Sequence, residues 1–144
     1  MKKEKAIQFR PWADEGTRAK LDPLETLDEV RALIEKWQDT TLEDLPRVAV
    51  DSPDFYDALP CAVSAIYFLG NDRQGLLYIG KATNLKTRWR RDHDAPSLNH
   101  AKLEQCLDLG DVELAWWAVP THCLVILENL LVRLHRPKWN NHVN

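Results

Sequence analysis

The stretch AIYFLGNDRQGLLYIG, residues 65–80, decides the fold that the sequence predicts. Two apolar runs are joined by a polar turn between Gly70 and Gly75, and each run carries a tyrosine beside an isoleucine. Aromatic and β-branched residues on both sides of a glycine-bounded turn are typical of a β-hairpin. We therefore expect two antiparallel strands, over residues 63–69 and 76–80.

The register of this hairpin decides where its two tyrosine side chains point. If residues whose numbers sum to 145 are paired, Tyr67 lies opposite Tyr78 and Ala65 lies opposite Gly80, which leaves a shallow spot beside the phenols. A slip of two residues keeps both tyrosines on one face in a diagonal arrangement, and a slip of one residue separates them. A stabilising cross-strand aromatic pair and a pair of catalytic phenols both fit this pattern.

Four further elements follow the hairpin. Asn84 is a suitable cap for a short helix over residues 85–93, and a second helix over residues 97–110 is closed by Gly110. Residues 112–119 form a strand that is apolar on both faces, and residues 121–136 form a long apolar helix. The order of elements after residue 58 is therefore β-β-α-α-β-α.

Residues 1–58 differ from the rest and are read as an acidic N-terminal extension, with residues 59–144 as the main domain. The extension holds four of the eight prolines, and its 9 Lys and Arg face 14 Asp and Glu. It predicts one amphipathic helix, starting at a capping box of Thr26 and Glu29. Such a helix needs a surface to pack on, in the main domain or in a partner protein. The acidic charge could guard a DNA site, or the segment could complete the fold.

Composition sets the broad class. The 144 residues suit one domain, no apolar run approaches the roughly 18 residues of a membrane span, and the N-terminus lacks a signal-peptide pattern. We therefore expect a cytoplasmic protein without membrane contact.

Three widely spaced cysteines, Cys61, Cys106 and Cys123, indicate reduced thiols used as core fillers, and argue against disulfides and against a zinc site. The net charge of −3 disfavours nucleic-acid binding, yet residues 59–144 carry 10 basic against 8 acidic residues.

Two charged residues lie on apolar helix faces. Arg88 shares a helix face with Leu85 and Trp89, where its guanidinium could bind a phosphate or pair with Asp92. Glu128 has only apolar neighbours one turn away, so its carboxylate needs compensation from Arg88, from Lys81 or from a divalent cation. A structural ion pair is an equal alternative for Glu128. Basic residues that are either solvated or in contact with a phosphate backbone are Lys86, Arg90, Arg91 and Lys102.

Several of these segments together resemble the GIY-YIG endonuclease family, and most of all the incision domain of bacterial nucleotide-excision nucleases. The segments are AIY, ten intervening residues, YIG, KATNLKTRW, LENLL and RPKWN, and they span about residues 61–141. The resemblance implies an α+β fold, in which a small three-stranded antiparallel sheet is flanked by helices. It also implies metal-dependent cleavage of DNA phosphodiesters, with one Mg²⁺ or Mn²⁺ ion as cofactor.

The resemblance assigns a role to each matching position. The motif tyrosines are Tyr67 and Tyr78, the lysine after YIG is Lys81, the essential arginine is Arg88, the metal ligand is Glu128, and the supporting asparagine is Asn140. The sequence departs from the family pattern at Ala65, which replaces a glycine, and at Trp139, where tyrosine is common. Asp92 stands where a histidine or tyrosine is usual, which leaves His93, or else His100, as a catalytic candidate.

These roles define a mechanism and a function to test. Glu128 is the one convincing metal ligand, Arg88 binds the phosphate, and Tyr67 is favoured as the base with Tyr78 positioning the water, although the tyrosines could exchange roles. We expect a DNA endonuclease that nicks one strand per active site, in DNA repair or restriction. The alternative is a non-cleaving module that binds nucleic acid or protein. A homodimer, or a protein partner bound through the extension, is also open.

Overall fold

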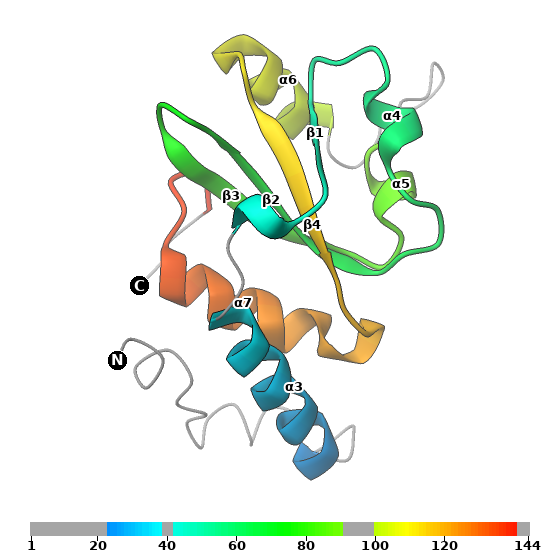
Figure 1. Cartoon of the computed structure of the whole chain (residues 1–144), viewed down its shortest axis with the longest axis vertical. Coiled ribbons are helices and arrows are strands. Elements are labelled where there is room, and N and C mark those ends of the chain that lie inside the picture. The colour runs from blue at the N-terminus through cyan, green and yellow to red at the C-terminus, as the bar shows by residue number, and fades with distance from the viewer. Residues whose placement is uncertain (1–22, 39–41, 91–99, 141–144) are drawn as a thin grey trace.

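The computed structural model describes residues 23–38, 42–90 and 100–140 (Figure 1). Within these ranges a four-stranded antiparallel sheet has the order β1-β4-β2-β3. Its strands are β1 (Arg47–Ala49), β2 (Ala65–Asn71), β3 (Gly75–Ala82) and β4 (Glu113–Ala118). Helices pack on both faces of the sheet, which confirms the predicted α+β class, whereas the predicted number of three strands is wrong by one.

The additional strand is β1, which comes from the segment that the sequence assigned to the extension. Arg47 to Ala49 pair with residues 113–115 of β4, and the Arg47 guanidinium also donates hydrogen bonds to Glu113 and to the Leu42 carbonyl of the 3₁₀ turn η1 (Leu42–Asp44). A strand of three residues after a proline has too little alternation to be recognised in sequence. Its backbone pairing covers the β4 edge, which would otherwise be open to association.

The β2–β3 hairpin confirms the expected strands but not the expected register. Tyr67 lies opposite Gly80, and Leu69 lies opposite Tyr78. The turn is one residue tighter than expected, because Gly75 adopts φ +75° and the Asn71 side chain accepts a hydrogen bond from the Gln74 amide at 2.7 Å. A bulge next to Leu69 adds a second offset of one residue. The total shift of two keeps both tyrosines on one face, in the diagonal arrangement, and moves Ala65 opposite Ala82.

One face of the sheet is covered by α3 (Pro23–Gln38) and α7 (Leu124–His135), which follows the 3₁₀ turn η2 (Thr121–Cys123) (Figure 1). Trp37 of α3 stacks on Phe68 and Trp117 with centroid separations of 5.1 and 4.9 Å. The extension therefore packs on the main domain through its predicted helix. The predicted capping box is wrong, because α3 already begins at Pro23, and Thr26 is a buried residue within the helix.

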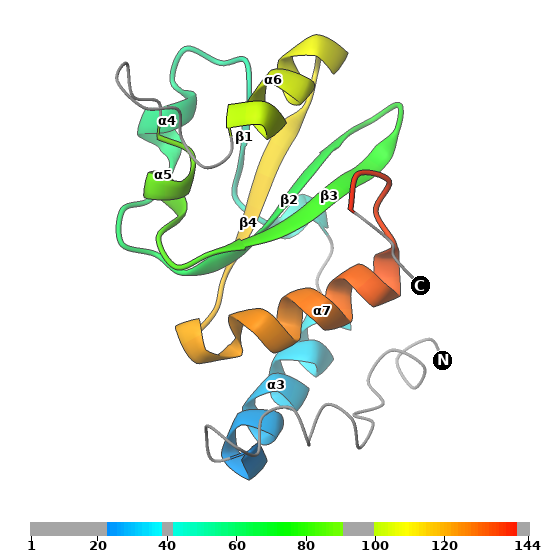
Figure 2. The same cartoon turned by 180° about the vertical axis from the view of Figure 1, so that it is seen from behind.

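The opposite face is covered by α4 (Phe55–Ala58), α5 (Leu85–Arg88) and α6 (His100–Leu109) (Figure 2). Trp89 is buried between these elements, and its ring contacts Phe55 and Tyr67 edge-on. Asn84 caps α5 as expected, because its side chain accepts a hydrogen bond from the Thr87 amide. The helix is shorter than the predicted 85–93, since it ends at Arg88. Residues 91–93 lie outside the described residues.

The cysteines are free, and two of the three fill the core as expected. Cys106 and Cys123 are buried, but Cys61 is exposed, so the expectation is wrong for that residue. Cys61 lies in the connection between α4 and β2, next to Ala62 with φ +56°, where the chain turns over the surface. In the described part of the chain, no helix combines the length and the apolar character that crossing a membrane requires.

Candidate active site at the edge strand

Five of the predicted site residues lie together around β3, the strand at one edge of the sheet. β3 contributes Tyr78 and Lys81, β2 contributes Tyr67, α5 contributes Arg88, and α7 contributes Glu128. Tyr78 lies on the α5 face, whereas Lys81 pairs with Ile66 and lies on the α7 face. The group therefore surrounds the β3 edge of the sheet and draws on the helices of both faces.

Tyr67 is fixed by the glycine opposite it. Its side chain is buried, with 2% of its surface exposed, and its ring lies edge-on against Trp89 with a centroid separation of 5.4 Å. A Cβ atom at Gly80 would collide with Cζ and the hydroxyl oxygen of Tyr67. The final glycine of the YIG segment is therefore needed for space, because the Tyr67 phenol occupies the position where a side chain would lie.

Tyr78 is the phenol at which the site residues meet. Its ring centroid lies 6.1 Å from that of Tyr67, and the Tyr67 hydroxyl forms a hydrogen bond with it. Partial burial and the charge of Glu128 raise the pKa of Tyr78 above its ordinary value of 10.0, although Arg88 and the hydrogen bond from Tyr67 oppose this rise. Tyr78 is thus a neutral phenol near pH 7, and neutralising Glu128 would lower its pKa.

Glu128 finds its partner outside its own helix, as the sequence predicts. The Lys81 ammonium donates to Oε1 of Glu128 at 3.1 Å, and the two side chains are 40% and 20% exposed. The carboxylate is thus compensated by Lys81 but open to solvent on one side. A single carboxylate near a phenol is a donor set that fits a hard cation such as Mg²⁺, which keeps most of its water ligands.

Arg88 lies at the end of α5, half-buried between the buried residues Leu85 and Trp89. Among the described residues, no carboxylate lies within ion-pair distance of its guanidinium, and its charge acts on Tyr78. The alternative partner Asp92 lies outside the described residues, as does the candidate base His93. The arginine donors are therefore available to an anion that approaches Tyr78.

Asn140 acts on the backbone of β3, because its side-chain amide is hydrogen-bonded to Ile79 at the edge of that strand. Its Oδ1 accepts from the Ile79 amide at 3.0 Å, and its Nδ2 donates to the Ile79 carbonyl at 2.9 Å. The neighbouring Trp139 amide donates to the Leu77 carbonyl at 2.7 Å. The segment after α7 thus pairs with β3 on either side of Tyr78, which fixes the backbone that carries the phenol.

The predicted nucleic-acid contacts fall in different surroundings. Lys102 lies at the site itself, because its Nζ is 4.4 Å from the ring centroid of Tyr78 and 5.5 Å from that of Trp139. Burial lowers its pKa. Lys86 is engaged in the α4–α5 contact, where it donates to the Leu59 carbonyl and covers the Tyr56 ring. Arg90 is exposed, and Arg91 lies outside the described residues.

Two contributions to this site escape sequence reasoning. The sequence places Lys102 among the phosphate-backbone contacts, but a helix residue 24 positions after Tyr78 gives no sign that it covers that ring. The register shift that puts Gly80 under Tyr67 depends on the bulge beside Leu69, and an alternating apolar pattern does not reveal a bulge. The glycine of YIG was the available signal, since a glycine within a strand often marks a close approach.

Comparison with known proteins gives a family match over most of the domain that carries this site. Residues 64–141 match the family described as the UvrC-like GIY-YIG domain. Similar proteins are the UvrABC system protein C of Anaeromyxobacter sp. strain Fw109-5, 36% identical over 86 residues, and that of Anaeromyxobacter dehalogenans strain 2CP-C, 37% identical over 76 residues. These matches cover 58% and 51% of this chain but only 12% and 11% of the relatives, so the chain spans about a tenth of their length.

Among solved structures, the chain resembles the GIY-YIG N-terminal endonuclease domain of UvrC from Thermotoga maritima, a point mutant bound to its catalytic divalent cation. The sequence identity is 27%, and the TM-score is 0.44. The match covers 58% of this chain and 89% of that domain.

Proposed function

This chain belongs to the UvrC-like GIY-YIG family and carries an endonuclease domain of that kind, and from this premise we propose that it hydrolyses DNA phosphodiester bonds with a bound divalent metal ion. The observation that carries the proposal is the meeting of Tyr67, Arg88 and Glu128 at the phenol of Tyr78. Phosphodiester hydrolysis needs a group for the attacking water, a cation for the phosphate and stabilisation of the leaving oxygen. The arrangement around β3 offers a residue for each need.

Glu128 is the residue that would hold the ion, Mg²⁺ or Mn²⁺, with water and substrate oxygens as the remaining ligands. When bound there, such an ion supplies positive charge that polarises the phosphate and stabilises the leaving oxygen. Before binding, Lys81 compensates the carboxylate at 3.1 Å. With a cation held by Glu128, the Lys81 ammonium would be free to direct its donors to the phosphate or to the phenols.

Arg88 would bind the non-bridging phosphate oxygens, and its fork of donors strengthens that contact as negative charge builds on the phosphate. Tyr78 would accept the proton of the attacking water, because it is the half-exposed phenol of the pair. Tyr67 is 2% exposed and donates to Tyr78, so it supports the phenolate and excludes water from its far side. The proposed roles are the reverse of those that the sequence favours.

The remaining assignments follow from position. Asn140 is a positioning residue, since it acts on Tyr78 through the backbone of Ile79. The described residues form one such site, which supports nicking of one strand by a monomer. The proposal concerns the incision chemistry of this domain and extends to no other part of the longer relatives.

Incubation of supercoiled plasmid with the full chain and Mg²⁺ or Mn²⁺ tests this function. We expect conversion to nicked circles by the wild type and none by Glu128→Ala, which loses the metal ligand. Glu104→Ala is the matched control, because Glu104 is an exposed glutamate on α6, and it should cleave normally. Nicking that persists in Glu128→Ala contradicts the metal assignment. DNA binding without cleavage by the wild type would instead favour the non-cleaving module.

A further inference from the structure

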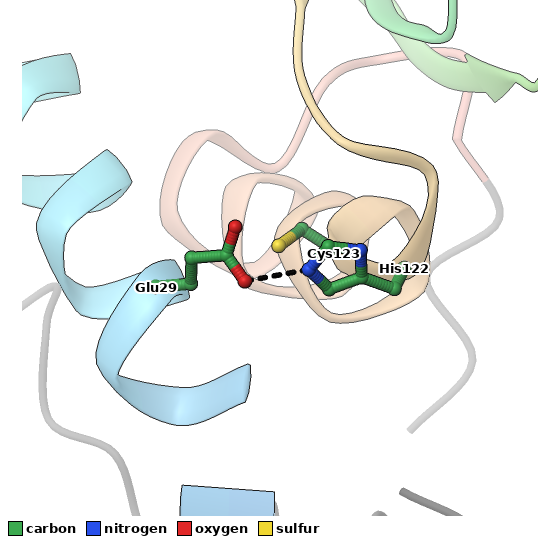
Figure 3. Close-up of side chains that lie close together, drawn as sticks. All are labelled: Glu29, His122 and Cys123. Carbon is green, nitrogen blue, oxygen red and sulfur yellow. Dashed lines mark hydrogen bonds and ion pairs between the residues drawn. The ribbon is translucent and has the colours of Figure 1, made fainter. Parts of the chain in front are cut away.

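A second cluster of metal-ligating side chains lies where the N-terminal helix α3 meets the turn that precedes α7 (Figure 3). Glu29 comes from α3, and His122 and Cys123 come from η2, the turn that leads into α7. One ligand atom of each residue lies within 4.8 Å of the other two. We propose that these residues form a zinc site that joins α3 to the main domain.

The geometry of the three donors suits a small tetrahedral cation. Nε2 of His122 lies 2.5 Å from Oε1 of Glu29, and the sulfur of Cys123 lies beside this contact (Figure 3). Zinc binds sulfur at about 2.3 Å and nitrogen or oxygen at about 2.0–2.2 Å, which places the ligands of one ion roughly 3.5 Å apart. An ion would replace the proton shared by Glu29 and His122, push those two atoms slightly apart and draw the sulfur in. A water molecule would be the fourth ligand.

The charges of the cluster balance on zinc binding. Burial and the nearby Glu29 carboxylate raise the pKa of the Cys123 thiol to about 11, so the sulfur stays protonated without a cation. A divalent ion would displace this proton and bind one thiolate, one carboxylate and one neutral imidazole. The sum of these charges is zero, which suits a cysteine that is fully buried at the α3–η2 contact.

A comparison with the other buried cysteine shows what is particular about Cys123. Cys106 is equally buried, and its pKa is also raised to about 11, but within the described ranges no pair of His, Asp or Glu ligand atoms lies around it. Cys123 instead faces a histidine and a carboxylate whose side chains are about half exposed, at 47% and 46%. An ion can therefore enter from the solvent side and reach the buried sulfur.

The positions of the three ligands in the sequence explain why the cysteine spacing argues against a zinc site. Its ligands come from segments 93 positions apart, and only two of them are neighbours in sequence. Zinc binding would fix the N-terminal helix on η2, at the opposite end of α7 from the segment that pairs with β3. The site is structural in this proposal and takes no part in DNA cleavage.

Cobalt substitution of the full chain tests the site, because a thiolate bound to Co²⁺ gives a charge-transfer band in the near ultraviolet. With reduced, metal-free protein we expect this band in the wild type, in Cys61→Ser and in Cys106→Ser, and its loss in Cys123→Ser. Competition with a chromophoric chelator should show that His122→Ala and Glu29→Gln weaken zinc binding by about 100-fold. Glu35→Gln is the control for Glu29→Gln, since Glu35 is an exposed glutamate of the same helix, and should bind zinc as the wild type does.

Thermal unfolding provides a readout that does not depend on Cys123, whose replacement in the core could prevent folding. Saturating zinc should raise the melting temperature of the wild type by roughly 5 °C or more. At the same zinc concentration the rise should be clearly smaller in His122→Ala, whose side chain is half exposed and can be removed without opening the core. A charge-transfer band that survives in Cys123→Ser, or equal zinc affinity of wild type and His122→Ala, would overturn the proposal.

Discussion

The two edges of the sheet are built in opposite ways. On one side, β1 is added to β4 by ordinary backbone pairing over three residues, together with an exposed ion pair between Arg47 and Glu113. The β3 edge is closed by a side-chain amide, that of Asn140, and by one backbone hydrogen bond from Trp139. A side chain can cover an edge without adding another strand. Residues of β3 therefore reach helices on both faces, and the candidate site lies at this edge.

The largest effect on this contrast should come from Arg88→Ala. Loss of the guanidinium removes the cation that we expect to bind the phosphate, so single-turnover nicking should fall by about 10²–10³-fold. Arg88→Lys should recover only part of the rate, because an ammonium lacks the planar fork. Nicking assays on both variants check this. Unchanged cleavage by Arg88→Ala would show that Arg88 does not bind the phosphate. The β3 edge would then have one fewer residue to distinguish it from the β1 edge.

The second prediction concerns the pH dependence of cleavage. The pKa of Tyr78 is raised above 10.0, so the phenolate that accepts a proton from water is a minor form near neutral pH. The phenolate fraction grows about tenfold per pH unit. The nicking rate should therefore also rise about tenfold for each pH unit between roughly pH 7 and 9, without a plateau. Rates of the wild type and Tyr78→Phe across this range measure it. A flat wild-type profile would contradict the role of Tyr78 as base.

A smaller effect is expected from Asn140→Leu, which keeps the size of the side chain but removes both hydrogen bonds to Ile79. Leaving the backbone amide and carbonyl of Ile79 without these partners should lower the free energy of unfolding by about 1–3 kcal/mol. Chemical denaturation measures this loss, with Asn129→Leu as control, because Asn129 is exposed on α7. Cleavage should fall as well, since the β3 backbone that carries Tyr78 loses its support. If the Asn140→Leu protein is destabilised but cleaves normally, Asn140 contributes to stability and does not position Tyr78 for cleavage.

The smallest effect is expected at the opposite edge. Arg47→Ala removes an ion pair whose side chains are 32% and 47% exposed and a hydrogen bond to the Leu42 carbonyl, so the free energy of unfolding should fall by about 1 kcal/mol or less. Nicking should be unchanged, because the strands β4 and β2 lie between Arg47 and β3. The same denaturation and plasmid assays apply. A strong loss of cleavage in Arg47→Ala would show that both edges serve the site.

The two edges also differ in how well the sequence predicts them: residues of the site at the β3 edge were predicted, whereas the strand β1 was not. The helix faces of Arg88 and Glu128 follow from spacing within one helix, and the Lys81 partner of Glu128 was among those expected. Local patterns therefore predict which residues the structure brings together around β3. β1 escaped because three residues after Pro46 carry no periodic signal, and its pairing with β4 depends on residues more than 60 positions away.

The hairpin register shows the same limit. Its two offsets arise from the backbone conformation at Gly75 and from the bulge beside Leu69, and neither alters the alternation of apolar residues. The zinc proposal was also out of reach of sequence reasoning, because Glu29 meets His122 and Cys123 only after α3 packs on η2. Long-range packing decides these features, and a single sequence does not encode them in any one segment.

The two offsets of the hairpin also determine which changes in length the protein can accept. Adding or deleting one residue between Leu69 and Tyr78 would turn Tyr78 towards α7 and separate it from Tyr67, whereas a change of two residues would keep the phenols on one face. The exposed residues 72–74 can vary in identity at little cost. In this loop, the odd or even number of residues is thus under stronger constraint than the residues themselves.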